Sequence, residues 1–256
     1  MIHLLLVLKT LLIFFIGFFT AFITTNVGGA TLLLVPTLIF IGLGPQAAIA
    51  TARLGTLSAK STGLYGFHMN GKVDYKIGLP AAIFGVIGAF LGANVLVILS
   101  YSILYRMIGF LILLTLIVVF VEKTMPHKLK IFDTSNGISK TRMIVGNILF
   151  IIPGFIGGLF GGQSIFASFI LILVFGESFL LTAGTRKIIG LAITVTALII
   201  YGLHHFIDWY YGVLLLAGMG IGSYFGAAYG IKKGELWVQR LFIVVVIAMA
   251  AKLIFV

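Results

Sequence analysis

Almost the whole chain consists of long apolar runs, and this feature limits the possible folds more than any other. Hydrophobic residues make up 61% of the 256 positions and charged residues only 9%, which is too much apolar surface for one water-soluble core. A membrane-spanning helix needs about 20 apolar residues. The sequence therefore predicts an all-α polytopic membrane protein with about eight to ten hydrophobic segments, and it leaves no room for a soluble catalytic domain. The apolar segments cover residues 4–25, 28–43, 46–68, 77–99, 102–121, 143–160, 163–175, 178–203, 209–230 and 236–256.

One sizeable polar stretch, residues 122–142, divides the chain into two halves. We predict a first transmembrane repeat over residues 1–121, a cytoplasmic basic loop over 122–142 and a second transmembrane repeat over 143–256. No small-residue cleavage site follows the first apolar segment, so we expect this segment to be retained rather than removed as a signal peptide.

The two halves match each other in sequence. Matched residues in the early part of each half are separated by the same number of positions along the chain. Matched residues in the later part are separated by one position more. A repeat with an odd number of spans must insert its second copy upside down, which predicts two inverted repeats. The matched positions are Gly28 and Gly29 with Gly161 and Gly162, Ala50 to Arg53 with Ala183 to Arg186, Asp74 with Asp208, Gly88 and Gly92 with Gly222 and Gly226, and Arg106 with Arg240.

The net charge of +11 is concentrated in a few loops. If the segments alternate, residues 69–76, 122–142 and 230–240 share one side and carry ten Lys and Arg, against three on the other side. Basic loops are typical of the cytoplasmic side and of anionic lipid. We therefore expect a cytoplasmic central loop, both termini outside, the lipid bilayer as a partner and no nucleic-acid partner.

Two apolar segments, 28–43 and 163–175, are short for a full crossing and directly follow glycine runs. Non-helical backbone at membrane depth survives only where it lines a cavity or is buried in protein. Each half is thus predicted to contain a glycine-broken hairpin followed by about three spans. The alternative is that glycine only eases helix packing, which is the role we expect at Gly88 and Gly222.

Four cations lie within apolar segments: Arg53, Lys60, Arg186 and Lys187. A cation at the bilayer centre costs at least about 2.5–3.5 kcal/mol, so each needs a partner, water or a ligand. Glu177 is the one plausible carboxylate nearby. The excess of cations predicts a site for an anion that arrives from solution. Alternatively, Arg53 snorkels to an interface, Arg186 pairs with Glu177, and Lys60 reaches a carbonyl or headgroup.

Hydroxyl and amide side chains cluster near these cations and near the glycine runs. Neutral donors of this kind suit an oxyanion that accepts many hydrogen bonds. Lys60, Lys187 and Glu177 are expected to have secondary roles. The predicted substrate-binding residues are Asn26, Gly28, Gly29, Thr31, Thr51, Arg53, Gly161, Gly162, Gln163, Ser164, Thr185 and Arg186.

Two rival functions remain open at this point. His204 and His205 with Asp208 could serve an intramembrane lipid-modifying enzyme, although adjacent histidines point to different helix faces and no third metal ligand is evident. A non-transporting membrane assembly protein is the second rival. The chain has no cysteine, which excludes thiolate metal sites, and we predict neither a metal nor catalytic residues.

The glycine and arginine motifs of both halves resemble the sulfite exporter TauE/SafE family, also called toluene-sulfonate uptake permeases. The two inverted repeats predict alternating access, and the resemblance implies a multi-pass inner (plasma) membrane permease without a cofactor for sulfite, thiosulfate, sulfonate or sulfoacetate-type anions. It leaves import or export, the coupling ion and a homo-oligomeric state open. Export is mildly favoured, because an anion leaving a negative interior gains about 2.3 kcal/mol per 100 mV. The motifs are Asn26-Val27-Gly28-Gly29-Ala30, Leu34-Val35-Pro36, Gly44-Pro45-Gln46 continuing to Arg53, Gly161-Gly162-Gln163 and Gly184-Thr185-Arg186-Lys187.

Overall fold

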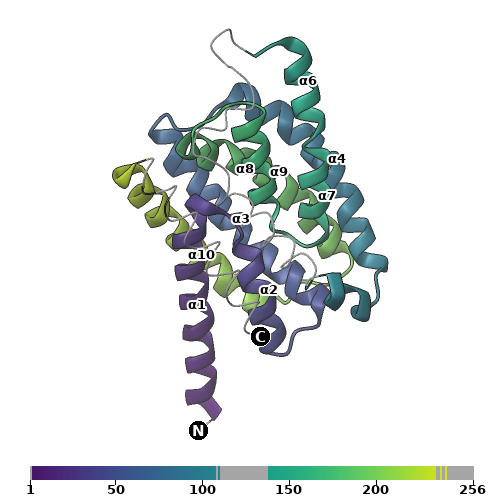
Figure 1. Cartoon of the computed structure of the whole chain (residues 1–256). Helices are drawn as coiled ribbons and strands as arrows, with labels where there is room; N and C mark the ends of the chain where they lie inside the picture. The colour runs from purple at the N-terminus through teal and green to yellow at the C-terminus, as the bar shows by residue number, and fades with distance from the viewer. Residues whose placement is uncertain (1, 108, 110–137, 235–236, 238–239, 241–256) are drawn as a thin grey trace.

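The chain folds into a bundle of helices (Figure 1). The computed structural model describes residues 2–107, 109, 138–234, 237 and 240, and this part of the chain contains no strand, which confirms the all-α prediction. The predicted segments 102–121 and 236–256 and the loop 122–142 lie largely outside the described residues. The helices are α1 (Ile2–Val27), α2 (Ala30–Phe40), α3 (Pro45–Met69), α4 (Tyr75–Ile98), α6 (Lys140–Ile148), α7 (Ile151–Leu159), α8 (Gln163–Leu173), α9 (Phe179–Leu203) and α10 (Trp209–Lys233).

Five helical stretches of the described chain are long and apolar enough to cross a membrane. The chain is therefore a multi-pass membrane protein. Helix α3 has 25 residues, about 37 Å at 1.5 Å per residue, but its polar and charged residues keep it out of this set. Helices α2 and α8 have 11 residues each and reach only about halfway. The five stretches are Leu8–Val27, Tyr75–Ile98, Lys140–Leu159, Phe179–Leu203 and Trp209–Lys233.

Local sequence explains where several helices begin and break. Asp74 and Asp208 cap α4 and α10, because each carboxylate accepts a hydrogen bond from backbone N–H groups of the first turn. Pro45 occupies the first turn of α3, where its missing N–H costs nothing. Pro153 cannot donate to the carbonyl four residues earlier, which accounts for the break between α6 and α7.

The helices of the two halves pack in matching pairs. Helix α10 lies along α1 and α3, and α4 lies along α7 and α9, so the last long helix described in each half packs on the other half. The backbone N–H of Asp208 donates to Thr51 Oγ1, and that of Asp74 donates to Thr185 Oγ1, both at 3.0 Å. Both halves thus form equivalent contacts across their interface, while their inverted orientation in a membrane stays a prediction.

Glycine makes two of these contacts possible. A Cβ at Gly222 would collide with the carbonyl oxygen of Phe18 in α1, and a Cβ at Gly88 would collide with that of Ile151 in α7. Close backbone approach of this kind is how small residues hold membrane helices together. The packing role predicted for these glycines is confirmed.

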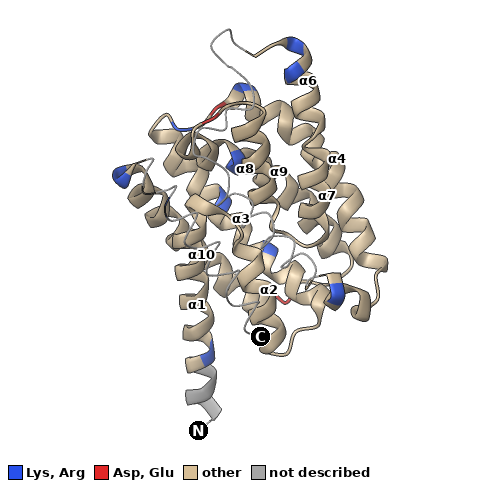
Figure 2. Cartoon of the chain, in the orientation of Figure 1, with Lys and Arg blue, Asp and Glu red and all other residues tan. Residues whose placement is uncertain are grey.

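Cations lie at the helix ends and also in the middle of the bundle, away from the ends (Figure 2). The four that the sequence places within apolar segments are all buried: Arg53, Lys60, Arg186 and Lys187 are between 0% and 8% exposed. None of the four reaches the surface, so these cations do not snorkel to an interface.

Candidate functional site

Two pairs of glycines with left-handed backbone conformation directly precede the short helices α2 and α8. Gly28 and Gly29 have φ values of 99° and 81°, and Gly161 and Gly162 have values of 93° and 77°. A side chain is strained in this region, which explains glycine at all four positions. The two turns also touch the opposite half: a Cβ at Gly28 would lie 2.8 Å from the Cβ of Ser164, and one at Gly161 would lie 2.6 Å from the Cβ of Thr31.

Both short helices begin at one cavity. Helices α2 and α8 have glycine at their N-caps and no side-chain cap hydrogen bond, so no cap side chain satisfies the N–H groups of their first turns. Unpaired N–H groups and the helix dipole together favour an anion at such an end. The first-turn residues that line the cavity are Ala30 and Thr31 of α2 and Gln163 and Ser164 of α8.

The cavity has a volume of about 40 Å³. Among the described residues its lining includes three cations and no Asp or Glu. One water molecule needs roughly 10–15 Å³ on this measure, so the space holds about three waters or one small ion. The lining residues are Ala21, Thr24, Thr25, Gly28, Gly29, Ala30, Thr31, Thr56, Ala59, Lys60, Gly162, Gln163, Ser164, Arg186 and Lys187.

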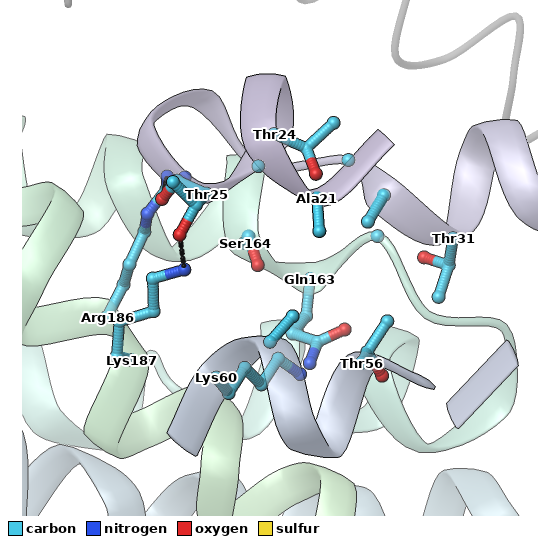
Figure 3. Close-up of a pocket in the computed structure, with 15 residues that line it drawn as sticks. Ala21, Thr24, Thr25, Thr31, Thr56, Lys60, Gln163, Ser164, Arg186 and Lys187 are labelled. Atoms are coloured by element: carbon cyan, nitrogen blue, oxygen red, sulfur yellow. Dashed lines mark hydrogen bonds between the residues drawn. The ribbon is translucent and has the colours of Figure 1, made fainter. Parts of the chain in front are cut away.

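The two lysines of the cavity are held by neutral acceptors. Lys187 Nζ donates to Thr25 Oγ1 at 2.5 Å (Figure 3). Lys60 Nζ donates to the carbonyl oxygen of Gly190 at 2.9 Å and also to the hydroxyl of Thr194. An ammonium group has three donors, so both lysines keep hydrogen-bonding capacity for a guest.

The hydroxyl of Thr25 in turn donates a hydrogen bond to Ser223. Its hydroxyl lies 2.7 Å from Ser223 Oγ, and Ser223 donates to the carbonyl oxygen of Ala59 at 2.5 Å. Because Ser223 uses its single proton on Ala59, Thr25 must donate to Ser223 and can accept from Lys187. This chain of hydrogen bonds links α9, α1, α10 and α3 and fixes the position of the Lys187 ammonium group.

Arg186 lines the cavity, but most of its hydrogen bonds hold the end of a neighbouring helix in place. Its Nη1 donates to the carbonyl oxygen of Val27 at 2.5 Å and to Ser168 Oγ at 3.2 Å, and its Nη2 donates to the carbonyl oxygen of Thr25 at 3.1 Å. These carbonyls end α1, so Arg186 satisfies groups that a helix C-terminus leaves unpaired. The charge of Arg186 still faces the cavity.

The helix bounds correct one part of the repeat alignment. The offset from the start of α3 to the start of α9 is longer by a single position than the offset from α2 to α8. The extra position lies in the connection 174–178, because the equivalent connection 41–44 is shorter by one. Arg53 therefore corresponds to Lys187 and not to Arg186 as the sequence match indicated. The two arginines do not form a symmetric pair.

Several other predicted residues lie outside the cavity lining. Asn26 is buried and donates from Nδ2 to the carbonyl oxygen of Gly226 at 2.8 Å. Thr51 and Thr185 accept from the α10 and α4 caps described above. Arg53 reaches the site only through Gln163, whose Oε1 lies 3.4 Å from its Nη1. Gly161 is beside the cavity, and its neighbour Gly162 lines it.

Glu177 lies in the connection between α8 and α9 and does not pair with Arg186. Neither of its carboxylate oxygens makes a well-formed hydrogen bond with the described residues, and the residue is 7% exposed. Burial raises the pKa of Glu177 to about 8, the nearby hydroxyls of Thr185 and Thr182 oppose this shift, and the negative charge of Asp74 adds to it. Glu177 is therefore mostly protonated at neutral pH and offers no counter-charge to the buried cations.

The sequence reasoning missed Thr24, Thr25 and Thr56, all of which line the cavity. Thr24 and Thr25 lie one turn before the first glycine pair, and Thr56 lies one turn before Lys60 on α3. Hydroxyls at these positions could have been found from their helical spacing to glycine and lysine positions already selected.

His204 and His205, the histidines that the hypothesis of a lipid-modifying enzyme depends on, are exposed and lie just after a helix end. His204 is the C-cap of α9, directly after Leu203, and His205 has a φ of 55° in the following turn. The Asp208 carboxylate caps α10. In the described part of the chain, no group of three or more His, Cys, Asp or Glu side chains could hold a metal ion.

Comparison with known proteins gives a consistent result. Residues 13–253 match the family described as "Sulfite exporter TauE/SafE". The chain is 25% identical to a probable membrane transporter protein, ORF9, of a Sinorhizobium species over 94% of this chain and 91% of the relative. It is 24% identical to a probable membrane transporter protein of Haemophilus influenzae over 95% and 94% of the two chains.

A further relative is the probable membrane transporter protein YdhB of Bacillus subtilis, which is 25% identical over 86% of this chain and 88% of that one. No solved structure matches the chain. The relatives are named as transporters and not as enzymes, in agreement with a bundle of apolar helices around a small cavity that Lys60, Arg186 and Lys187 help to line. The chain belongs to the sulfite exporter TauE/SafE family of membrane transporters.

Proposed function

We propose that this transporter moves small sulfur-containing oxyanions across the inner membrane and binds them in the cavity between α2 and α8. One observation carries the proposal: two helix N-termini without side-chain caps meet Lys60, Arg186 and Lys187 at one cavity whose described lining has no carboxylate. Backbone N–H donors and cations both prefer an anion. A cation or a neutral apolar guest would leave these groups uncompensated.

The size of the cavity supports an anion of about four non-hydrogen atoms. A volume of about 40 Å³ matches roughly three water molecules, which is close to the size of sulfite. Thr24, Thr31 and Thr56 also line this space. The hydroxyls of Thr24 and Thr56 donate to the carbonyl oxygens of Thr20 and Arg53, so each would have to give up that bond before it could donate to an anion. Thiosulfate, sulfonates and sulfoacetate are larger, so they require the cavity to widen.

The arrangement of the two halves supports alternating access. The cavity lies where the glycine pairs of both halves meet, and the two short helices there have few long-range contacts beyond their own half apart from that meeting point. Movement of one half against the other would open the cavity to alternate sides. Export is the favoured direction, because each negative charge leaving a negative interior gains about 2.3 kcal/mol per 100 mV.

Flux measurements in proteoliposomes test the proposed function. We expect sulfite to leave the vesicles in proportion to an imposed membrane potential and without a proton gradient. Thermal stabilisation by sulfite, thiosulfate, sulfate and a small sulfonate then ranks the substrates, with sulfite among the strongest. If none of these anions stabilises the protein or moves across the membrane, the proposal is wrong. Strict dependence on a proton gradient would overturn the preference for export.

A further inference from the structure

Arg53 is the least satisfied cation of the described bundle interior. It is 0% exposed, and its one hydrogen bond to a described residue is the long contact of 3.4 Å from Nη1 to Gln163 Oε1. Its Nε and Nη2 atoms have no partner among the described residues. Arg186 by contrast makes three hydrogen bonds. A structural arginine is expected to resemble Arg186, so the state of Arg53 needs another explanation.

The two unpaired atoms of Arg53 form one edge of the guanidinium group. The N–H bonds of Nε and Nη2 run parallel, and this edge binds two oxygens of one oxyanion at once. A lysine in the same place would offer only a point charge. The free edge is therefore complementary to two oxygens of a planar or pyramidal oxyanion, whereas a single carbonyl oxygen would leave one of its two donors unpaired.

Gln163 connects Arg53 to the cavity. Its side chain is 2% exposed and lines the cavity at the start of α8. Arginine only donates hydrogen bonds, so the amide oxygen of Gln163 must face Arg53. The amide nitrogen Nε2 then has no partner among the described residues. Gln163 thus places a weak acceptor against Arg53 and an unused donor beside it.

No described group supplies the missing negative charge. Lys60, two turns along α3, carries the same charge as Arg53, and the hydroxyl of Tyr201 donates its proton to the carbonyl oxygen of Gly158. Glu177 does not line the cavity, and its own oxygens are unpaired. Three buried donors therefore have no acceptor among the described residues: Arg53 Nε, Arg53 Nη2 and Gln163 Nε2.

We propose that the Nε and Nη2 edge of Arg53 is a second, inner binding position for the transported oxyanion, and that Gln163 is a placeholder which the anion displaces. This inference rests on the proposed function, because the anion reaches Arg53 from the cavity. In the empty protein the Gln163 oxygen is the one acceptor of the guanidinium group among the described residues, but it lies at Nη1 and leaves the Nε and Nη2 edge unpaired. When the anion moves inward, the Gln163 amide turns and its Nε2 donates to the anion.

The substitution Gln163→Glu tests the placeholder directly. A carboxylate at this position has the shape of the amide but carries the charge that Arg53 lacks, so it acts as a built-in competitor. We expect Gln163→Glu to raise the unfolding temperature of the empty protein, to weaken sulfite binding at least 100-fold and to stop sulfite flux in proteoliposomes. Gln163→Ala removes the placeholder without adding a competitor and should weaken sulfite binding less than tenfold.

Arg53→Lys and a double variant complete the test. Arg53→Lys keeps the charge but loses the two-atom edge, so we expect a folded protein that binds sulfite at least tenfold more weakly. In an Arg53→Gln background, Gln163→Glu should lower the unfolding temperature, because its carboxylate is then buried without a partner. Sulfite binding by Gln163→Glu within twofold of the native protein would overturn the inner position while leaving the proposed function intact. Absence of sulfite binding by the native protein would instead overturn both.

Discussion

Replacing Lys187 by Met should change stability and anion binding in opposite directions. An ammonium group inside the bilayer costs about 2.5–3.5 kcal/mol, and the single bond from Lys187 Nζ to Thr25 Oγ1 returns about 1.5–3 kcal/mol. Met has a similar length and no charge. Thr25 keeps its bond to Ser223, so no buried group loses its only partner. We expect Lys187→Met to be as stable as the native protein or more stable, by up to about 2 kcal/mol, which is the largest difference between these two terms.

The same substitution should weaken the binding of a sulfite-sized anion strongly. A cation roughly 5 Å from an anion contributes about 3 kcal/mol at an effective dielectric constant of about 20, which corresponds to a factor of about 100 in Kd. Thermal unfolding in detergent with increasing sulfite measures both quantities in one assay. Lys232→Met, at an exposed position on the last turn of α10, is the matched control and should leave both unchanged. A variant that loses stability but binds sulfite normally would show that Lys187 is a structural residue and refute the reasoning.

The remaining predictions concern pH and topology. Because burial holds the pKa of Glu177 near 8, above the usual value of 4.5, the native protein should lose up to a few kcal/mol of stability as the pH rises from about 5 to about 8. Glu177→Gln should remove most of this dependence in unfolding curves at pH 6 and pH 9, and an unchanged dependence would assign it to another group. The chain has no cysteine, so Lys76→Cys and His204→Cys introduce single labels. A membrane-impermeant maleimide should reach position 204 from outside the cell and position 76 only after lysis, and the opposite pattern would contradict the predicted orientation.

Hydrophobic runs were sufficient to predict most of the fold. The lengths of apolar segments depend on the thickness of the bilayer, so the predicted segments 46–68 and 178–203 agree with α3 and α9 to within a residue at each end. The glycine pairs before α2 and α8 were predictable because only glycine adopts positive φ easily. The break between α6 and α7 was missed, although Pro153 provides its cause.

The sequence selected several of the residues that line the cavity but not the contacts that each of them makes. Buried cations could be selected because charge is costly in an apolar segment. The hydrogen-bond partners depend on contacts between the halves, and a one-residue difference between two connections moved Lys187 into the position that the alignment gave to Arg186. Arg186 caps a helix end and Arg53 keeps two nitrogen atoms unpaired among the described residues. This difference depends on tertiary contacts, which the spacing of apolar residues in the sequence does not reveal.

The location of a bound oxyanion tests the central claim most directly. Selenite has the pyramidal shape of sulfite and contains a heavy atom that can be identified in an experimental structure of the complex. We expect selenium between the first turns of α2 and α8, with its oxygens in hydrogen-bonding distance, about 2.7–3.2 Å, of the Lys60 and Lys187 ammonium groups or the free edge of Arg53. Selenium found only near exposed cations such as Lys232, with the cavity unchanged, would contradict the account.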